Sequence, residues 1–413
     1  MNLLFVSETF PDAASPAKGT YNAALCRALA ARNTVRVVAP RQWPDALRRL
    51  VRRQSTTTPE SLTAAAVEAA YPTYWYTPKV GETFYGGWMW RSVRRSADRF
   101  HRAAPIDGVL SYWAHPDGEA GLRAAKRFGV PSAVIVGGSD VLLLPKRPGR
   151  GACVRRVLTE SSAVITVSEG LRSAVIELGV DPSRVHTITQ GVDREVFHPG
   201  EQEAARRRLG LGISGSKTLV WVGRMVDVKR LDLLLDACRL LWKSGMRLSL
   251  HLVGEGPLRP VLERQAREAG LEECVHFEGA VGHDQLADWY RSADLAVMSS
   301  SSEGLPNVLR EAVACGTPFV STDVGSIREI ARPEFSRLVP AGSAAALATA
   351  IRETLHPSYK EAARAYQPRS WEDCANDIER LFERLRGEKG AGAPETTGRG
   401  SVSSDRRVPL GIP

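Results

Sequence analysis

Two successive series of short apolar runs, each separated by helix-length amphipathic segments, constrain the fold of this chain most strongly. Continuous Val/Ile/Leu runs between helices indicate strands of a parallel sheet that is covered on both faces. In the first half the expected strands are Leu3–Val6, Val35–Ala39, Gly108–Ser111, Ser132–Val136 and Ala163–Val167, and the expected helices are Thr20–Arg32, Gly118–Phe128 and Val154–Glu160. This half is therefore predicted to be a doubly wound α/β domain.

The second half repeats the same alternation. Its expected strands are Thr218–Val222, Leu248–Val253, Val275–Glu278, Leu295–Met298 and Phe319–Ser321, and its expected helices are Arg230–Ser244, Leu258–Ala269, Gln285–Ser292 and Asn307–Cys315. The sequence thus predicts two Rossmann-like domains, 1–195 and 196–370, with a hinge in 190–200, followed by an amphipathic helix over 371–386. Residues 387–413 lack an apolar period and are expected to be disordered.

Composition excludes several other classes of protein. The 413 residues are 43% hydrophobic and 24% charged, which is ordinary for a globular chain. The six cysteines never lie closer than 36 residues and no histidine has a partner at metal-ligand spacing, so no metal site is predicted. The N-terminus does not resemble a signal peptide and no apolar run is long enough to span a membrane, which together favour a cytoplasmic protein.

The net charge of +9 is confined to one half of the chain. Residues 1–195 contain 26 basic and 17 acidic side chains, whereas residues 196–413 contain 29 of each. Such asymmetry favours an anionic partner for the first half, either phosphate, nucleic acid or a membrane surface. No nucleic-acid recognition motif accompanies the charge, and an arginine-rich surface without any partner remains the alternative.

An aromatic stretch interrupts the first half between Tyr71 and Trp90. It contains eight aromatic residues in twenty, together with two prolines and three glycines that argue against a regular helix. The basic residues Arg91, Arg94 and Arg95 follow it. Aromatic and basic side chains together suit a membrane interface or a sugar-stacking surface, and the alternative is that the rings pack onto their own domain.

The segment from Ser301 to Glu311 carries the strongest local indication of a binding site. It follows the expected strand Leu295–Met298, so it begins at the carboxyl edge of a parallel sheet, where α/β proteins bind ligands. Gly304 permits close backbone approach, and Pro306 suits the first turn of a helix. The amide groups of Asn307, Val308 and Leu309 would then form a helix N-terminus that attracts phosphate.

Two carboxylates flank this expected phosphate site. Glu303 precedes the helix and Glu311 lies within it. Each carboxylate could accept hydrogen bonds from sugar hydroxyls, one at either end of a diphosphate. The alternative is that Glu303 only caps the helix and Glu311 lies on a solvated face.

Two further turns of the second half point to the same edge. Arg224 and Lys229 stand on the loop after the strand Thr218–Val222, where two cations could converge on a diphosphate; an exposed basic loop is the alternative. Gly254 lies in a Gly-Glu-Gly turn after the next strand, but Arg259 replaces the third glycine of a dinucleotide fingerprint.

The first half contributes three candidate turns. Gly19 precedes the first helix, and His115 stands between a strand and a helix, a place where a core histidine is unexpected. The sequence Gly137-Gly138-Ser139-Asp140 ends the following strand in the same way.

These motifs resemble those of the retaining glycosyltransferases of family 4. The resemblance rests on GRMVDVKR from Gly223, LVGEGP from Leu252, the run SSSSEGLPNVLREAVACGTPFVSTDVGSIREI, and, in the first half, WAHPDG, GGSD, TVSEGLR and QGVDREVFHP. It covers about residues 3–385. One departure is that this chain has Gly137 where the family often has histidine.

The resemblance implies a GT-B fold, with a nucleotide-sugar donor on the second domain, an acceptor on the first and a final helix that crosses back. By motif position, Arg224 and Lys229 would bind the diphosphate, Glu303 the donor sugar and Glu311 the ribose. Binding contacts are also implied for Gly19, Gly254, Gly304, Leu305, Asn307 and Val308. His115 would touch the donor sugar near the reaction centre, and no metal or other cofactor would be required.

The expected function is transfer of a sugar, from a UDP-sugar or alternatively a GDP-sugar, to a saccharide or lipid-linked acceptor in cell-surface polysaccharide synthesis. The basic first half and the aromatic stretch favour an enzyme bound peripherally to the inner face of the plasma membrane. A small soluble acceptor is the second hypothesis. A non-catalytic scaffold is the third, and the presence of Arg224, Lys229, Glu303 and Glu311 disfavours it.

Overall fold

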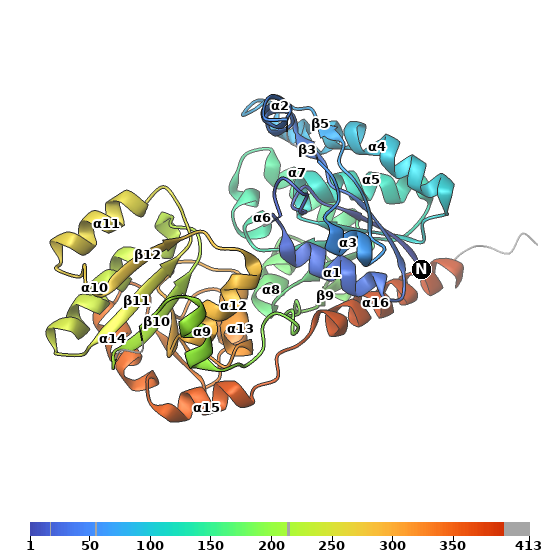
Figure 1. Cartoon of the computed structure of the whole chain (residues 1–413). Coiled ribbons are helices and arrows are strands. Elements are labelled where there is room, and N and C mark those ends of the chain that lie inside the picture. The colour runs from blue at the N-terminus through green and yellow to red at the C-terminus, as the bar shows by residue number, and fades with distance from the viewer. Residues whose placement is uncertain (17, 54–55, 213–214, 392–413) are drawn as a thin grey trace, which may run out of the picture.

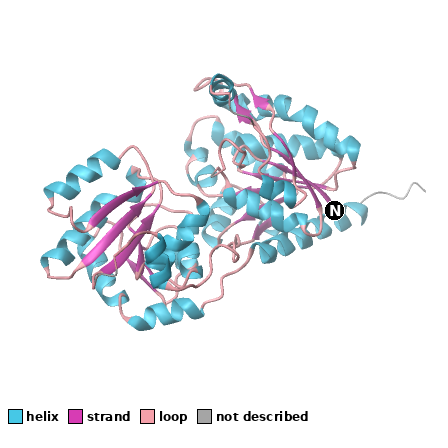
Figure 2. Ribbon diagram, viewed as in Figure 1, coloured by secondary structure: helices cyan, strands magenta, loops and turns pink. Residues whose placement is uncertain are grey.

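The computed structural model describes residues 1–16, 18–53, 56–212 and 215–391, which form two α/β domains (Figures 1 and 2). The N-terminal domain is built on a seven-stranded parallel sheet of order β4-β2-β1-β6-β7-β8-β9. Its strands are β1 (Asn2–Val6), β2 (Thr34–Val38), β4 (Glu68–Ala70), β6 (Gly108–Tyr112), β7 (Ser132–Val136), β8 (Ala163–Thr166) and β9 (Val185–Thr187). The parallel sheet expected from the apolar runs is confirmed.

Alternate residues of each central strand feed different cores, because successive side chains point to opposite faces. Leu3 and Phe5 of β1 pack on one face, whereas Leu4 and Val6 pack on the other. The first face is covered by α1 (Thr20–Ala30), α7 (Arg150–Glu160) and α8 (Glu169–Glu177), and the second by α4 (Tyr85–Ala103) and α5 (Glu119–Phe128). Helices on both faces make this a doubly wound domain.

The C-terminal domain repeats this plan with a six-stranded parallel sheet of order β12-β11-β10-β13-β14-β15. Its strands are β10 (Lys217–Val222), β11 (Leu248–Val253), β12 (Val275–Gly279), β13 (Leu295–Met298), β14 (Phe319–Thr322) and β15 (Ser336–Val339). Helices α10 (Leu231–Lys243), α11 (Arg259–Glu268) and α14 (Ala344–Thr354) cover one face, and α12 (His283–Ser292), α13 (Asn307–Ala314) and α15 (Pro357–Ala365) the other.

The chain crosses between the domains twice, and the two crossings lie side by side. The first leads from β9 to α9 (Gln202–Arg208), and the second leads from α15 to the last helix α16 (Trp371–Ala391). Val192 on the first crossing forms a bridge with Ser370 on the second. Helix α16 then packs on the N-terminal domain, where Phe382 is fully buried (Figure 1).

The expected end of the last helix is wrong, because α16 continues to Ala391 rather than ending at Arg386. Residues 392–413 of the expected tail lie outside the described residues.

Helix α4 begins inside the aromatic stretch, which corrects the expectation that this stretch contains no regular helix. Residues Tyr85–Trp90 form its first turns despite Gly86 and Gly87. Gly86 is required by close packing, since a Cβ atom there would lie 2.4 Å from a carboxylate oxygen of Glu119 on α5. Upstream of α4, β5 (Thr73–Tyr74) pairs with β3 (Arg41–Gln42) beside α2 (Trp43–Val51).

Within the described residues, the structure contains no helix with both the length and the apolar composition needed to cross a bilayer.

Candidate active site at the domain boundary

Loops that follow three neighbouring strands of the second sheet are tied together at its carboxyl edge. The backbone amide of Ser301, after β13, donates to the carbonyl of Val228, after β10, at 2.8 Å. The amide of Met225 donates to the carbonyl of Glu255, after β11, at 2.9 Å. These bonds hold the Arg224–Lys229 loop beside the loop that carries Glu303.

Lys229 and Glu303 meet at this edge. The Lys229 Nζ atom lies 2.6 Å from Glu303 Oε1, and the two side chains are 21% and 11% exposed. Lys229 ends a short 3-10 turn, Asp227–Lys229, that directs its side chain toward the β13–α13 loop. The structure therefore brings together two residues that the sequence predicted from separate motifs.

Helix α13 begins directly after this pair without a capping side chain. Pro306 occupies the N-cap position, and no side-chain hydrogen bond reaches the first turn. The amide groups of Asn307 and Val308 belong to that first turn, where an α-helix has no internal acceptor for them. An uncapped helix N-terminus with a neighbouring cation can bind an oxyanion.

Arg224 stands at the same edge with an exposed side chain, and it forms no ion pair among the described residues. Gly254 packs against the backbone of the loop that carries Arg224. At φ +141°, a Cβ atom on residue 254 would lie 1.8 Å from the carbonyl oxygen of Gly223. Glycine is therefore required at 254 by backbone packing, while a ligand contact by Gly254 stays a prediction.

Glu311 lies one turn into α13 and faces the N-terminal domain. Tyr290 donates its hydroxyl to Glu311 Oε2 at 3.1 Å. Burial raises the pKa of the Glu311 carboxyl to about 7, although the Tyr290 hydrogen bond and the Arg310 charge act in the opposite direction. At neutral pH the protonated and the ionised forms of the Glu311 side chain are therefore both populated.

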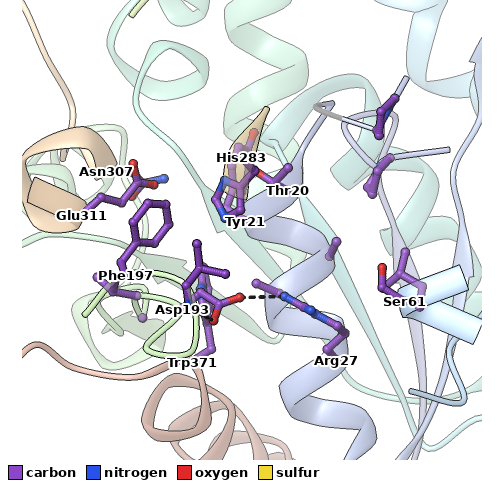
Figure 3. A pocket seen from close by; sticks show the side chains of 18 of the residues that line it. Thr20, Tyr21, Arg27, Ser61, Asp193, Phe197, His283, Asn307, Glu311 and Trp371 are labelled. Atoms are coloured by element: carbon purple, nitrogen blue, oxygen red, sulfur yellow. Dashed lines mark hydrogen bonds and ion pairs between the residues drawn. The ribbon is translucent and has the colours of Figure 1, made fainter. Parts of the chain in front are cut away.

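A pocket of about 280 Å³ lies between the two domains and includes Glu311 (Figure 3). Thr20, Tyr21 and Arg27 of α1 line one side, and Asn307 and Glu311 line the other. Its floor comes from the first domain crossing, where Asp193 pairs with Arg27 at 2.9 Å. No local sequence pattern predicts the contributions of Tyr21, Arg27, Asp193 and Phe197, because these residues converge only when the two domains meet.

Gly19 is the N-cap residue of α1 and directly precedes Thr20 and Tyr21, which line this pocket. Its φ of +70° is left-handed, and a Cβ atom there would lie 2.3 Å from the carbonyl oxygen of Thr9. The glycine expected from the sequence is thus required for the turn that presents Thr20 and Tyr21 to the pocket.

The Gly137-Gly138 loop touches Gly304 across the domain boundary. A Cβ atom on Gly304 would lie 3.1 Å from the carbonyl oxygen of Gly137. Asp140 shapes this loop, because one of its carboxylate oxygens accepts from the amides of Gly137 and Gly138 at 3.1 and 2.9 Å. Leu305, expected to bind ligand, packs its side chain against the core of the N-terminal domain.

Gly137 is explained by its neighbour Tyr112. A Cβ atom at position 137 would lie 2.4 Å from the Tyr112 hydroxyl oxygen. The position where the family often has histidine is therefore closed to a larger side chain here.

His115 is buried within the N-terminal domain in this structure, and the expectation that it touches the donor sugar stays a prediction. Its side chain is fully buried, and neither ring nitrogen forms a hydrogen bond among the described residues, although Nε2 lies 3.6 Å from Glu119 Oε2. Burial lowers the pKa of the ring to about 4, so the imidazole is neutral at physiological pH. The sequence placed His115 correctly after β6 but could not show which way the ring turns.

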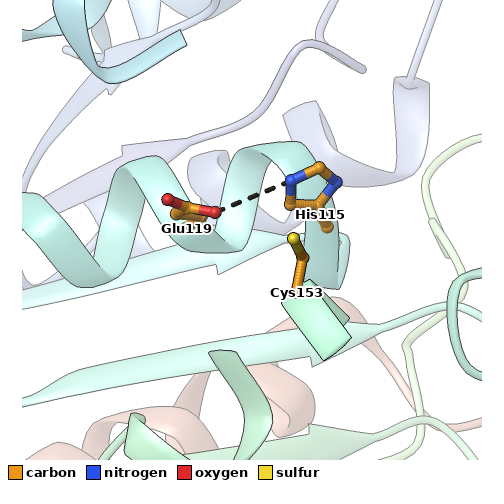
Figure 4. A group of neighbouring side chains, drawn as sticks. All are labelled: His115, Glu119 and Cys153. Carbon is orange, nitrogen blue, oxygen red and sulfur yellow. Dashed lines mark ion pairs between the residues drawn. The ribbon is translucent and has the colours of Figure 1, made fainter. Parts of the chain in front are cut away.

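His115, Glu119 and Cys153 form the one group within the described ranges whose ligand atoms lie close enough to consider a metal ion, within 4.8 Å of one another (Figure 4). Glu119 is already paired with Arg123 at 2.7 Å and with Arg156 at 2.8 Å. Two guanidinium groups on the only carboxylate of the group oppose cation binding. We therefore assign no metal to it.

Comparison with known protein families agrees with this arrangement. Residues 19–196 match the model described as "Glycosyltransferase Family 4", and residues 216–356 match "Glycosyl transferases group 1". The chain is similar to the D-inositol 3-phosphate glycosyltransferase of Frankia alni, with 34% identity over 60% of this chain and 64% of that protein. It is also similar to that of Mycobacterium tuberculosis, with 30% identity over 71% of this chain and 65% of the relative. The matched regions thus span a little under two thirds of these relatives.

Solved structures share the whole architecture. Sucrose-phosphate synthase from Thermosynechococcus elongatus has a TM-score of 0.75 and 21% identity, covering 94% of this chain and 99% of that structure. Anabaena HepE in complex with UDP has a TM-score of 0.65 and 18% identity, covering 95% and 99%. Two parallel-sheet domains that meet across these loops therefore define the GT-B class of fold. Within that class, the chain belongs to the family 4 glycosyltransferases.

Proposed function

We propose that this protein is a retaining glycosyltransferase that moves a sugar from a nucleoside diphosphate sugar to a hydroxyl group of an acceptor. The observation that carries the proposal is the Lys229–Glu303 pair, which lies directly before the uncapped N-terminus of α13. A cation on the loop after β10, a carboxylate on the loop after β13 and the free amides of α13 together match a charged diphosphate joined to a polyhydroxyl sugar.

The chemistry requires stabilisation of the leaving group above all. The bond between the sugar C1 and the β-phosphate oxygen breaks, and a new bond forms from C1 to the acceptor oxygen on the same face. The acceptor proton passes to the departing phosphate oxygen, so the products are the glycoside and the nucleoside diphosphate. Lys229, Arg224 and the α13 amides stabilise the negative charge that develops on that phosphate.

The donor is proposed to be a UDP-sugar. HepE, which shares the fold of this chain, was solved with UDP and with UDP-glucose. Glu311 lines the pocket beside α13 and supports ribose binding through a carboxylate that accepts from hydroxyl groups. A GDP-sugar is the alternative donor.

The proposed acceptor is a lipid-linked saccharide of cell-surface glycan synthesis, used by a cytoplasmic enzyme at the inner face of the membrane. The positive charge of residues 1–195 and the aromatic stretch support this acceptor. A small soluble polyol phosphate is the second candidate, favoured by the relatives named D-inositol 3-phosphate glycosyltransferase.

The test has two stages. Thermal-shift measurements with UDP, GDP and ADP identify the nucleotide, because a ligand that binds only the folded state raises its melting temperature. Transfer assays with the matching sugars follow, using inositol phosphate and a polyprenyl-linked saccharide as acceptors, and NMR of the product reports the anomeric configuration. UDP should stabilise the protein most, and the product should keep the donor's configuration. Inversion would overturn the retaining mechanism, and the absence of transfer and hydrolysis with every common donor would overturn the proposal in favour of a scaffold.

A further inference from the structure

Helix α2 presents its apolar face to solvent. Leu47, Leu50 and Val51 are 53%, 75% and 77% exposed, and no residue of the helix is buried. These three residues stand at i, i+3 and i+4, so they share one side of the helix. A surface helix of a globular protein normally turns such a side toward the core.

The opposite side of α2 is fixed to the domain by charge, which explains this orientation. Arg49 Nη1 lies 2.8 Å from Asp12 Oδ2, and Arg49 Nη2 donates to Ser15 Oγ at 3.0 Å. Asp12 is fully buried, and Arg41 also pairs with it at 2.7 Å. Turning the leucines inward would withdraw Arg49 from the buried Asp12 carboxylate and from Ser15, so these contacts favour the outward orientation of the leucines.

Aromatic side chains extend the exposed apolar surface beyond α2. Trp43 stacks on Trp75, with ring centroids 6.0 Å apart and planes 7° from parallel. Trp75 is 66% exposed, and Phe84, beside Trp88, is 64% exposed. These residues belong to the part of the N-terminal domain where α2, β3, β5 and the start of α4 gather (Figure 1).

Unpaired basic residues border the same surface. Arg91, Arg94 and Arg95 of α4 line a groove together with Trp43 and Trp75. All three arginines are exposed, and none forms an ion pair with another described residue. Arg52 and Arg53 follow α2 and are also exposed.

We infer that this surface, defined by α2, Trp75, Phe84 and the arginines of α4, docks on an anionic lipid bilayer. Aliphatic side chains on an amphipathic helix enter the region between headgroups and acyl chains, and tryptophans favour the same depth. Arginines at the border attract anionic headgroups, each adding to the affinity at low salt. Exposed apolar side chains bordered by unpaired positive charges favour a membrane as the partner. A second copy of this chain is disfavoured, because it would bring the same positive charges together.

Docking would also orient the catalytic loops. Asp12 and Ser15, which anchor α2 through Arg49, lie on the loop that leads from β1 to Gly19. The membrane-facing helix therefore contacts residues of the chain segment that leads to the start of α1, which lines the pocket. This inference deepens the proposed function and depends on it for the acceptor that the membrane would present.

The test is flotation of the full-length protein with vesicles. Vesicles of equal parts phosphatidylglycerol and phosphatidylcholine should carry the wild-type protein at about 0.05 M salt, and binding should weaken at about 0.5 M salt. The double variant Leu47→Glu/Leu50→Glu should lower the bound fraction by about tenfold. Leu240→Glu/Val261→Glu, which changes two exposed apolar residues of the C-terminal domain, should bind as the wild type does.

A second pair of variants tests the charge. Arg94→Gln/Arg95→Gln should weaken binding by about tenfold, whereas Arg264→Gln/Arg267→Gln on α11 should not. Failure of the wild-type protein to float, or equal loss in both control variants, would overturn the docking surface. Sugar transfer to a soluble acceptor would then persist and leave the proposed function standing. Concentration-dependent dimerisation abolished by Leu50→Glu, without vesicle binding, would show that α2 is a protein interface instead.

Discussion

Lys229 and Glu303, on two neighbouring loops, neutralise each other at the place that would also receive a diphosphate. Because both side chains are largely buried, neither charge is free of the other without a ligand. Binding of a nucleotide sugar would replace this single ion pair with two sets of contacts, phosphate oxygens on Lys229 and sugar hydroxyls on Glu303. Arg224 needs no such exchange, because its exposed side chain has no partner of its own among the described residues.

Removing either cation should slow the chemical step. We expect Arg224→Ala and Lys229→Met each to lower kcat by about a hundredfold or more, since each deletes a donor to the leaving phosphate. Arg264→Ala on α11 serves as the control, and circular dichroism checks the fold. Steady-state kinetics with the preferred donor provide the measurement. Near-full turnover in both variants would contradict the assigned roles.

The raised pKa of Glu311 predicts a pH-dependent stability. A carboxyl whose pKa is about 7 when folded, against an ordinary value near 4.5, holds its proton more tightly in the folded state. Its contribution to stability is therefore complete below the ordinary pKa and is lost as the pH rises through about 7. Glu311→Gln removes this dependence, so the variant should gain roughly 1–3 kcal/mol on the wild type between about pH 4 and about pH 8.

Urea unfolding at both pH values, without nucleotide, measures that gain. Glu361→Gln, at an exposed glutamate of α15, is the control and should show no such trend. A pH-independent difference between wild type and Glu311→Gln would contradict the shift.

Among the secondary-structure elements, the N-terminus of α8 forms a contact between the domains. The carboxylate of Glu329, in the 3-10 turn Ile327–Glu329 of the C-terminal domain, accepts from the amides of Glu169 and Gly170 at 2.9 and 3.0 Å. Ser326 and Ser168 add a hydroxyl contact at 2.8 Å. Together with the Gly137–Gly304 contact, these bonds hold the two sheets' loops against each other.

Loss of Glu329 should favour a more open molecule. An exposed carboxylate at a helix N-terminus contributes about 1 kcal/mol, so Glu329→Ala should raise the open population by about fivefold. Spin-label distances between Arg102 on α4 and Arg264 on α11, each replaced by a labelled cysteine, report the opening. All six native cysteines are buried, which limits unwanted labelling.

Arg328→Ala is the matched control for this prediction. It removes an exposed ion pair with Asp323 in the same turn and leaves the α8 contact intact. Identical distance distributions for the wild type and Glu329→Ala would mean that the contact does not hold the domains.

For the whole molecule, α16 makes the C-terminal end of the described chain part of the N-terminal core. Phe382 is fully buried there, and a Cβ atom at Gly108 of β6 would lie 2.6 Å from its ring. The stability of the first domain therefore depends on residues that follow the second domain in the sequence.

Phe382→Ala should destabilise the N-terminal domain selectively. Truncation of a buried phenylalanine costs about 3–5 kcal/mol. Hydrogen exchange should accelerate in β1 and β6 and remain unchanged in β10 and β11. Leu240→Ala, at an exposed position, is the control. Equal acceleration in both sheets would mean that the domains unfold as one unit.

Much of the fold could be predicted because its evidence is local. Strand β13 has the expected bounds, Leu295–Met298, and α13 differs from its expected range by one residue at its C-terminal end. Apolar runs bounded by turn residues specify such elements regardless of the rest of the chain. The aromatic stretch was harder, because Gly86 and Gly87 oppose a helix locally, whereas the packing of Glu119 that requires glycine at position 86 is a tertiary contact.

The candidate site likewise has features that local sequence predicts and features that only tertiary contacts decide. The sequence by itself determined the two-domain architecture and placed Arg224, Lys229, Glu303 and Glu311 at loops or helices that follow strands. This was possible because strand ends, glycine turns and helix starts depend on neighbouring residues. Only the tertiary structure decided that His115 turns into the core, that Glu329 binds α8, and that α2 turns its leucines outward. Each of these depends on contacts between residues that are distant in sequence, such as Asp12 with α2 and Cys153 with His115. No local sequence pattern predicts such contacts.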